Sequence, residues 1–223
     1  MLDIPYLIVA FLKIACFASV GLYLLLQWVK LEKKYTSDIP FLMGIALIFF
    51  IPGMIIDILY TLEIVGLGLI FNIRYILDMI SMILFFGSLL SVWMSSRVKL
   101  RYIIITSLTV IFAIIYLLVP AYESLLLLDT VHIFVSLPTI LIVIITFLFT
   151  YYTKRLTNVH GLLIALAAIV VLVSQIARPV LKGVAVSIIM PSGLAWAANL
   201  IAVLGWIILF LGFKLKPAYI ENI

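Results

Sequence analysis

Charged side chains interrupt several otherwise apolar runs of this chain, and they are the residues best suited to chemistry or binding. They are Lys13, Asp57, Arg74, Asp78 and Arg178. A charge at the centre of a bilayer costs roughly 2.5–3.5 kcal/mol on insertion scales, so such residues pair with one another, face a cavity or mark a functional site. We therefore expect any site of this protein to lie among them.

Uncharged polar residues extend this set. Counted at about 1.5 Å per residue from the expected outer end of each segment, the five charges, His132 and Asn199 lie roughly 7 to 16 Å deep. Gln175 precedes Arg178 by three residues and Trp196 precedes Asn199 by three, so each pair shares a helix face. The inner halves of the segments hold only Ser, Thr and Gln as polar residues. The polar set is thus confined to the outer half.

These residues predict an outward-facing polar pocket. Arg74 and Asp78 are one helical turn apart, and Ser81 and Ser88 continue their stripe. The pocket would have a slightly positive net charge, which suits an anion or the negative end of a dipole. Its acidic residues are Asp57 and Asp78, and its basic residues are Lys13, Arg74 and Arg178. In the alternative interpretation the same ion pairs only fix the register of the helices.

Several kinds of chemistry are missing from the sequence. His132 and His160 are expected near opposite membrane faces, so they cannot share a metal or a haem. Cys16 is the only cysteine, and no Ser or Cys nucleophile has a plausible His partner. The expected cations beside Asp57 and Asp78 argue against a shared catalytic proton. We predict no catalytic residue, no metal, no cofactor and no enzymatic activity.

The elements that carry these residues follow from composition. Of 223 residues, 67% are hydrophobic and only 10% are charged, which leaves too little polar surface for a water-soluble globule. Apolar runs of about 20 residues predict spanning helices. We predict an all-α integral membrane protein, one domain over residues 1–223 with seven transmembrane helices. Their expected ranges are 4–29, 40–62, 67–94, 102–119, 127–152, 159–182 and 192–213.

The loops indicate the orientation. Basic residues cluster on one side of the expected bundle, whereas Glu63, Glu123 and Asp129 lie on the other. Because cytoplasmic loops are enriched in Lys and Arg, we expect the amino terminus outside and the carboxyl terminus in the cytoplasm of a multi-pass cell-membrane protein. The net charge of +5 reflects this bias and does not indicate nucleic acid. The basic residues are Lys30, Lys33, Lys34, Arg97, Lys99, Arg101, Lys154, Arg155, Lys214 and Lys216.

The segment Arg74-Tyr75-Ile76-Leu77-Asp78 resembles the Arg-Tyr-x-Asp segment of microbial rhodopsins, with one extra residue before the aspartate. The size, the seven expected helices and the outer Pro179 followed by Pro191 are also similar to that family. The resemblance implies a similar bundle with Arg74 and Asp78 in a central outward network. Residues 197–210 contain no lysine, so a retinal Schiff base in the seventh helix is excluded and no light-driven pump is implied.

Three classes of function remain. The first is a sensor or receptor-like binder of a small ligand or ion, which fits one polar pocket on one side. The second is a transporter of a small solute or ions, although the two halves of the chain do not align as repeats. The third is a non-catalytic membrane subunit. Besides the lipid bilayer, the short cytoplasmic loops imply a membrane partner subunit or a second copy of the chain.

Overall fold

The computed structural model describes residues 4–33, 35–36, 38–62, 64, 69–94, 96–118, 125–156, 158–182 and 194–217. Within these ranges the chain forms seven α-helices and no strand. The helices are α1 (Ile4–Val29), α2 (Ile39–Thr61), α3 (Leu69–Trp93), α4 (Val98–Leu118), α5 (Leu125–Tyr152), α6 (Gly161–Lys182) and α7 (Ala195–Lys214).

The helix ends agree with the expected ranges to within four residues, and the largest difference is at the start of α4. This helix begins at Val98, so Lys99 and Arg101 belong to its first turn and not to a loop. Lys and Arg are good helix formers, so the helix extends beyond its apolar run. The prolines do not interrupt the helices: α2 continues through Pro52 and α5 through Pro138.

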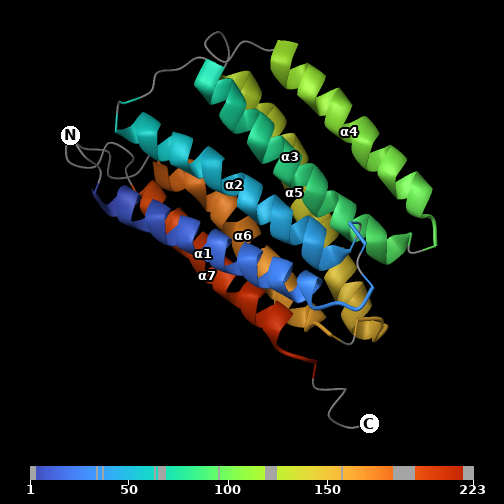
Figure 1. Ribbon diagram of the computed structural model, residues 1–223. Helices are drawn as coiled ribbons and strands as arrows, with labels where there is room; N and C mark the ends of the chain where they lie inside the picture. The colour runs from blue at the N-terminus through green and yellow to red at the C-terminus, as the bar shows by residue number, and fades with distance from the viewer. Residues whose placement is uncertain are drawn as a thin grey trace. The chain divides into compact units, whose positions relative to one another are not determined.

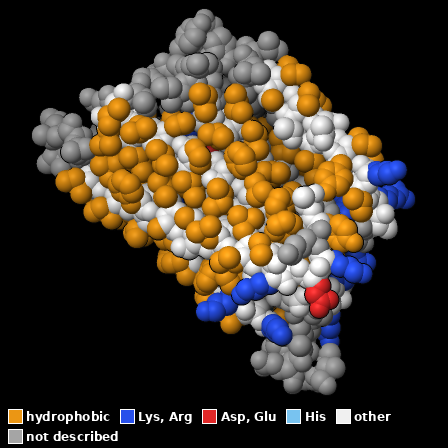
Figure 2. Space-filling view, viewed as in Figure 1, with side chains coloured by type: hydrophobic (Ala, Val, Ile, Leu, Met, Phe, Trp, Pro, Cys, Tyr) orange, Lys and Arg blue, Asp and Glu red, His pale blue; other side chains and the backbone are white. Residues whose placement is uncertain are grey.

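The apolar faces of the helices identify a membrane protein. In the described residues five helical stretches are long and apolar enough to cross a bilayer. Figure 2 shows hydrophobic side chains over most of the visible face, with groups of Lys and Arg at its margin. A helix satisfies its own backbone hydrogen bonds, which a hydrocarbon solvent requires. The five stretches are Ile4–Val29, Ile39–Tyr60, Ile76–Trp93, Gly161–Arg178 and Trp196–Lys214.

The chain divides into two compact units. The central unit is Phe17–Thr139, and the terminal unit combines Met1–Cys16 with Ile140–Ile223. The central unit contains the second half of α1, α2, α3, α4 and the first half of α5, whereas the terminal unit contains the first half of α1, the end of α5, α6 and α7.

In the central unit, small residues let α1 and α2 approach closely. A Cβ atom added at Gly44 would lie 3.1 Å from the carbonyl oxygen of Gly21, and one at Gly21 would lie 3.2 Å from that of Gly44. Phe17 and Phe50 pack edge to face nearby, with ring centroids 5.4 Å apart. On the other side of α2, α3 packs between α2 and α4 (Figure 1). Such glycine contacts are typical of helix packing in lipid.

In the terminal unit, α6 and α7 pack side by side (Figure 1). A Cβ at Gly205 would lie 2.8 Å from Val171 Cγ2, and one at Gly212 would lie 2.7 Å from Ile164 Cγ1. These two glycines mark the contact between the helices. The buried alanines beside them are Ala165, Ala167, Ala168, Ala198 and Ala202.

The connection between α5 and α6 is held by main-chain caps. Lys154 has φ 52°, and the amides of Lys154 and Arg155 donate to the carbonyls of Tyr151 and Thr150. This is a Schellman end for α5 in which a lysine occupies the position that glycine favours. His160 then caps α6: its Nδ1 accepts from the Leu163 amide at 3.4 Å.

Candidate polar site

The central unit brings three of the predicted site residues together. Arg74 Nε donates to Asp57 Oδ1 at 3.0 Å, and Arg74 Nη2 donates to Asp57 Oδ2 at 3.2 Å. Arg74 Nη1 lies 3.4 Å from Asp78 Oδ2, one turn further along α3. One guanidinium thus joins a carboxylate on α2 in the bidentate geometry that makes such pairs strong, while holding a second carboxylate on its own helix. We call Asp57, Arg74 and Asp78 the charge cluster.

A glycine makes the approach of the two helices possible at the charge cluster. A Cβ atom at Gly53 would lie only 2.8 Å from Asp78 Oδ1. Gly53 is one turn before Asp57, so both face α3 from the same side of α2. Any side chain at this position would push Asp78 away. This role of Gly53 depends on where α2 and α3 cross, so no local sequence pattern predicts it.

The burial of the charge cluster is graded. Side-chain exposure falls from 24% for Asp57 to 12% for Arg74 and 9% for Asp78. The formal charges of the three, −1, +1 and −1, sum to −1. The positive excess expected for the whole polar set is therefore not a property of this cluster, because it depended on Lys13 and Arg178, which belong to the terminal unit.

The serines that continue the stripe along α3 bond to their own helix. Ser81 Oγ donates to the Leu77 carbonyl at 2.8 Å, and Ser88 Oγ donates to the Phe85 carbonyl at 2.6 Å. Both side chains are fully buried. Back-bonding of this kind satisfies a hydroxyl without any external group. The chemistry of α3 is thus concentrated at Arg74 and Asp78.

In the terminal unit, the packing of α6 on α7 fixes the position of Arg178. Gly212 of α7 faces Ile164 of α6, and Gly205 of α7 faces Val171 of α6. A step of seven residues back along α7 therefore matches a step of seven residues forward along α6. The next pair in this antiparallel register is Ala198 and Arg178. The Leu194 amide, which donates to the Leu181 carbonyl at 3.1 Å, supports the same alignment. Arg178 therefore lies on the side of α6 that faces α7, level with the first turn of α7.

The other polar residues of α7 lie on a different face. At 100° per residue, Trp196 is opposite Gly205 and Asn199 is about 120° away from it. Asn199 is buried, and Trp196 is half-buried with its Nε1 enclosed and without a hydrogen-bond partner in the described part of the chain. On α6, Gln175 is half-buried one turn before Arg178. These groups offer hydrogen-bond donors at the amino-terminal end of α7.

Negative charge is nearly absent from the terminal unit. Its acidic residues are Asp3 and Glu221 alone, next to the two chain ends. The half-buried Arg178 side chain makes no ion pair or hydrogen bond with another described residue. The terminal unit therefore combines a cation in a spanning helix with the positive end of the α7 macrodipole, and its own sequence places no carboxylate in the spans.

Two other predicted site residues, Lys13 and His132, lie on α1 and α5. Lys13 is half-buried on the part of α1 that belongs to the terminal unit. His132 lies on α5, but its side chain is outside the described residues. Over the described ranges, no three His, Cys, Asp or Glu side chains gather where they could hold a metal ion.

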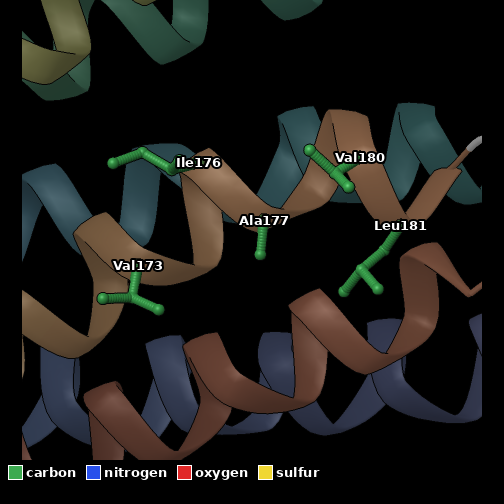
Figure 3. Close-up of a pocket in the computed structure, with 5 residues that line it drawn as sticks. All are labelled: Val173, Ile176, Ala177, Val180 and Leu181. Carbon is green, nitrogen blue, oxygen red and sulfur yellow. The ribbon is translucent and has the colours of Figure 1, made fainter.

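A hollow on α6 lies beside the Arg178 face but is apolar. Figure 3 shows the residues that line it along one stretch of α6: Val173, Ile176, Ala177, Val180 and Leu181. No polar atom lines this hollow. Its surface suits an acyl chain and not a charged ligand. The polar site and the hollow are thus separate features of the same helix.

Comparisons with known proteins identify no relative: no family model, curated protein or solved structure matches this chain. The microbial-rhodopsin resemblance stays a prediction, and the site carries the functional argument.

Proposed function

We propose that this protein is a seven-helix membrane sensor that binds a small anionic ligand or ion through the donor groups of α6 and α7. In this proposal all seven helices cross the bilayer, with the amino terminus outside and the carboxyl terminus in the cytoplasm. The polar halves of the helices then open to the outside. The bundle is rhodopsin-like only in its architecture.

The observation that carries the proposal is the position of Arg178 in a unit whose spans hold no carboxylate. Arg178 lies level with the first turn of α7, where the amino-terminal end of the helix dipole adds its own positive potential. The terminal unit has no carboxylate nearby to balance it. An anion bound there would gain a guanidinium contact and a helix amino terminus together, which is the usual composition of an anion site.

The charge cluster supplies a plausible moving part for a sensor. Arg74 bonds Asp57 across the helix interface and also lies against Asp78 on its own helix. If the bond to Asp57 breaks, Arg74 keeps a counter-ion and stays half-buried at low cost. Asp78 thus offers Arg74 a counter-ion in a second arrangement of α2 and α3, as a conformational switch requires.

Thermal unfolding of the purified protein in neutral-lipid nanodiscs tests the binding. Chloride, sulfate, acetate, benzoate and glutamate are added separately, with choline as the cationic comparison. We expect at least one anion to raise the unfolding midpoint of the wild type, and Arg178→Gln to lose that shift. Arg155→Gln is the matched control, because Arg155 is exposed outside the spanning helices and carries the same charge.

Flux across a vesicle wall separates the sensor from the alternatives. A sensor binds the anion without moving it, so vesicles containing the protein should hold an anion gradient as well as empty vesicles do. Flux that is abolished by Asp78→Asn would identify a transporter. If no anion shifts the midpoint and no flux appears, the charges serve only to fix the helices.

A further inference from the structure

Arg101 is buried at the opposite, basic end of the central unit. It is the fourth residue of α4, and only 6% of its surface is exposed. Its Nε has no hydrogen-bond partner among the described residues. An enclosed guanidinium nitrogen without an acceptor is costly, because it loses its water without gaining a bond.

The packing of α4 shows where this side chain lies. Gly87 on α3 faces Ile105, one turn after Arg101 on the same side of α4. Side chains in a helix lean toward its amino terminus, so Arg101 covers the first turn of α4. The Arg101 amide donates to the Arg97 carbonyl, and the three amides before it in the turn, those of residues 98–100, have no acceptor within the helix. Arg101 is thus aimed at a helix amino terminus on the α3 side.

The surroundings of Arg101 are basic and tied together. The Thr36 and Tyr102 hydroxyls lie 2.6 Å apart and join the α1–α2 connection to α4. Asp38 Oδ2 is occupied by the Tyr35 amide at 2.9 Å. The described charged residues at this end are five basic and two acidic, a net charge of +3. They are Lys30, Lys33, Arg97, Lys99 and Arg101 against Glu32 and Asp38.

The level of this cluster relative to the membrane identifies the anion. Tyr35, Trp93 and Tyr102 are exposed here at the ends of apolar helices. Exposed Trp and Tyr in that position mark the interface, where lipid phosphates lie. Basic clusters immediately beside spanning helices bind anionic headgroups.

We propose that Arg101, with the first-turn amides of α4 and the exposed Arg97 and Lys99, binds the phosphate of an anionic phospholipid headgroup. Nε and a terminal nitrogen of one guanidinium together form the bidentate donor pair that arginine uses for phosphate. This site belongs to the central unit, whereas the proposed ligand site belongs to the terminal unit, and neither depends on the other.

Titration of the detergent-solubilised full chain with phosphatidylglycerol or phosphatidylcholine tests this site. Native mass spectrometry counts bound lipids, and thermal unfolding gives the affinity. We expect the wild type to prefer phosphatidylglycerol, and Arg101→Gln to weaken that binding by about tenfold or more, the loss of a charge-assisted contact. Arg155→Gln removes the same charge from the terminal unit and should leave the binding within about twofold of wild type.

Two further arms keep the test decisive. Arg101→Lys keeps the charge and serves if Arg101→Gln does not fold; it should bind phosphatidylglycerol several-fold more weakly, because a lysine lacks the paired N–H groups. Inorganic phosphate at the same concentration should not stabilise the wild type. Equal losses in Arg101→Gln and Arg155→Gln, wild-type affinity in Arg101→Lys, or stabilisation by free phosphate would each overturn the proposal.

Discussion

The central and terminal units differ in what surrounds an arginine of their apolar helices. In the central unit, Arg74 is held between two carboxylates, with a bidentate contact to Asp57 across the helix interface. In the terminal unit, Arg178 has no carboxylate of its own unit within the spans, and glycine and alanine contacts join α6 to α7. The first arrangement pairs its arginine within the unit, whereas the second has no carboxylate in the spans of its own unit to pair with Arg178.

This difference separates a structural charge from a binding charge. Removing one member of a buried ion pair leaves its partner uncompensated and costs several kcal/mol. Removing an unbalanced cation beside a helix amino terminus relieves repulsion. Residue type and depth are nearly the same for Arg74 and Arg178, so the neighbouring carboxylates make the distinction. The expected effects are differences in unfolding free energy between each variant and the wild type, measured in mixed micelles of neutral detergent and dodecyl sulfate.

The largest effect is expected at the charge cluster. Arg74→Gln should lower the unfolding free energy by about 3 kcal/mol, because the half-buried Asp57 and the buried Asp78 are left without their shared cation. Adding Asp57→Asn to Arg74→Gln should recover part of the loss. If the two losses simply add, the bidentate contact does not stabilise the protein.

The packing of α6 on α7 should show the next largest effect. Gly205→Ala places a Cβ 2.8 Å from Val171 Cγ2 and 3.1 Å from the Ala167 carbonyl oxygen. The helices must separate to admit it, at a cost of about 2 kcal/mol. The neighbouring Leu204→Ala, at an exposed position, is the control and should change the stability little. Equal effects of both changes would argue against close packing.

The cap of α6 should contribute less. His160→Ala removes the Nδ1 acceptor of the Leu163 amide and the ring stacked on Tyr151. We expect a loss of about 1 kcal/mol, typical of an amino-terminal cap. His160→Asn should retain most of the stability, because asparagine is a good capping residue. A full loss in the asparagine variant would assign the effect to the ring and not to the cap.

The smallest effect is expected at the end of α5, and it should be a gain. Lys154 has a left-handed conformation that glycine adopts without strain. Lys154→Gly should therefore raise the unfolding free energy by about 0.5 kcal/mol. Lys154→Ala removes the same charge but keeps the unfavourable conformation, so it should give no gain. A gain in both would point to charge and not to backbone conformation.

The sequence was sufficient for much of the fold. Apolar length alone located the seven helices, because a spanning helix satisfies its own backbone and needs no distant partner. The four-residue spacing of Arg74 and Asp78 predicted their contact for the same local reason. The cost of leaving a charge in lipid predicted that the aspartates and the cations would pair, but not that Arg74 would bind Asp57.

Features set by the crossing of helices were not predictable in this way. Gly53 and Gly205 matter because another helix passes within van der Waals contact of them, which no local pattern encodes. Arg101 was expected in a basic loop, yet the start of α4 buries it. The division of the chain into two units also separates Lys13 and Arg178 from the charge cluster, although the expected net charge of the pocket had combined them. His132 remains a sequence prediction.

The central claim is tested most directly by the unfolding free energy of Arg178→Gln, measured in neutral-lipid nanodiscs without and with the anion that stabilises the wild type. Without the anion, Arg178→Gln should be at least as stable as the wild type, whereas Arg74→Gln should be clearly less stable. When the anion is added, the unfolding free energy of the wild type should rise, and that of Arg178→Gln should not change. A loss of several kcal/mol in Arg178→Gln without any anion would contradict the account, because it would show that Arg178 already has a structural counter-ion.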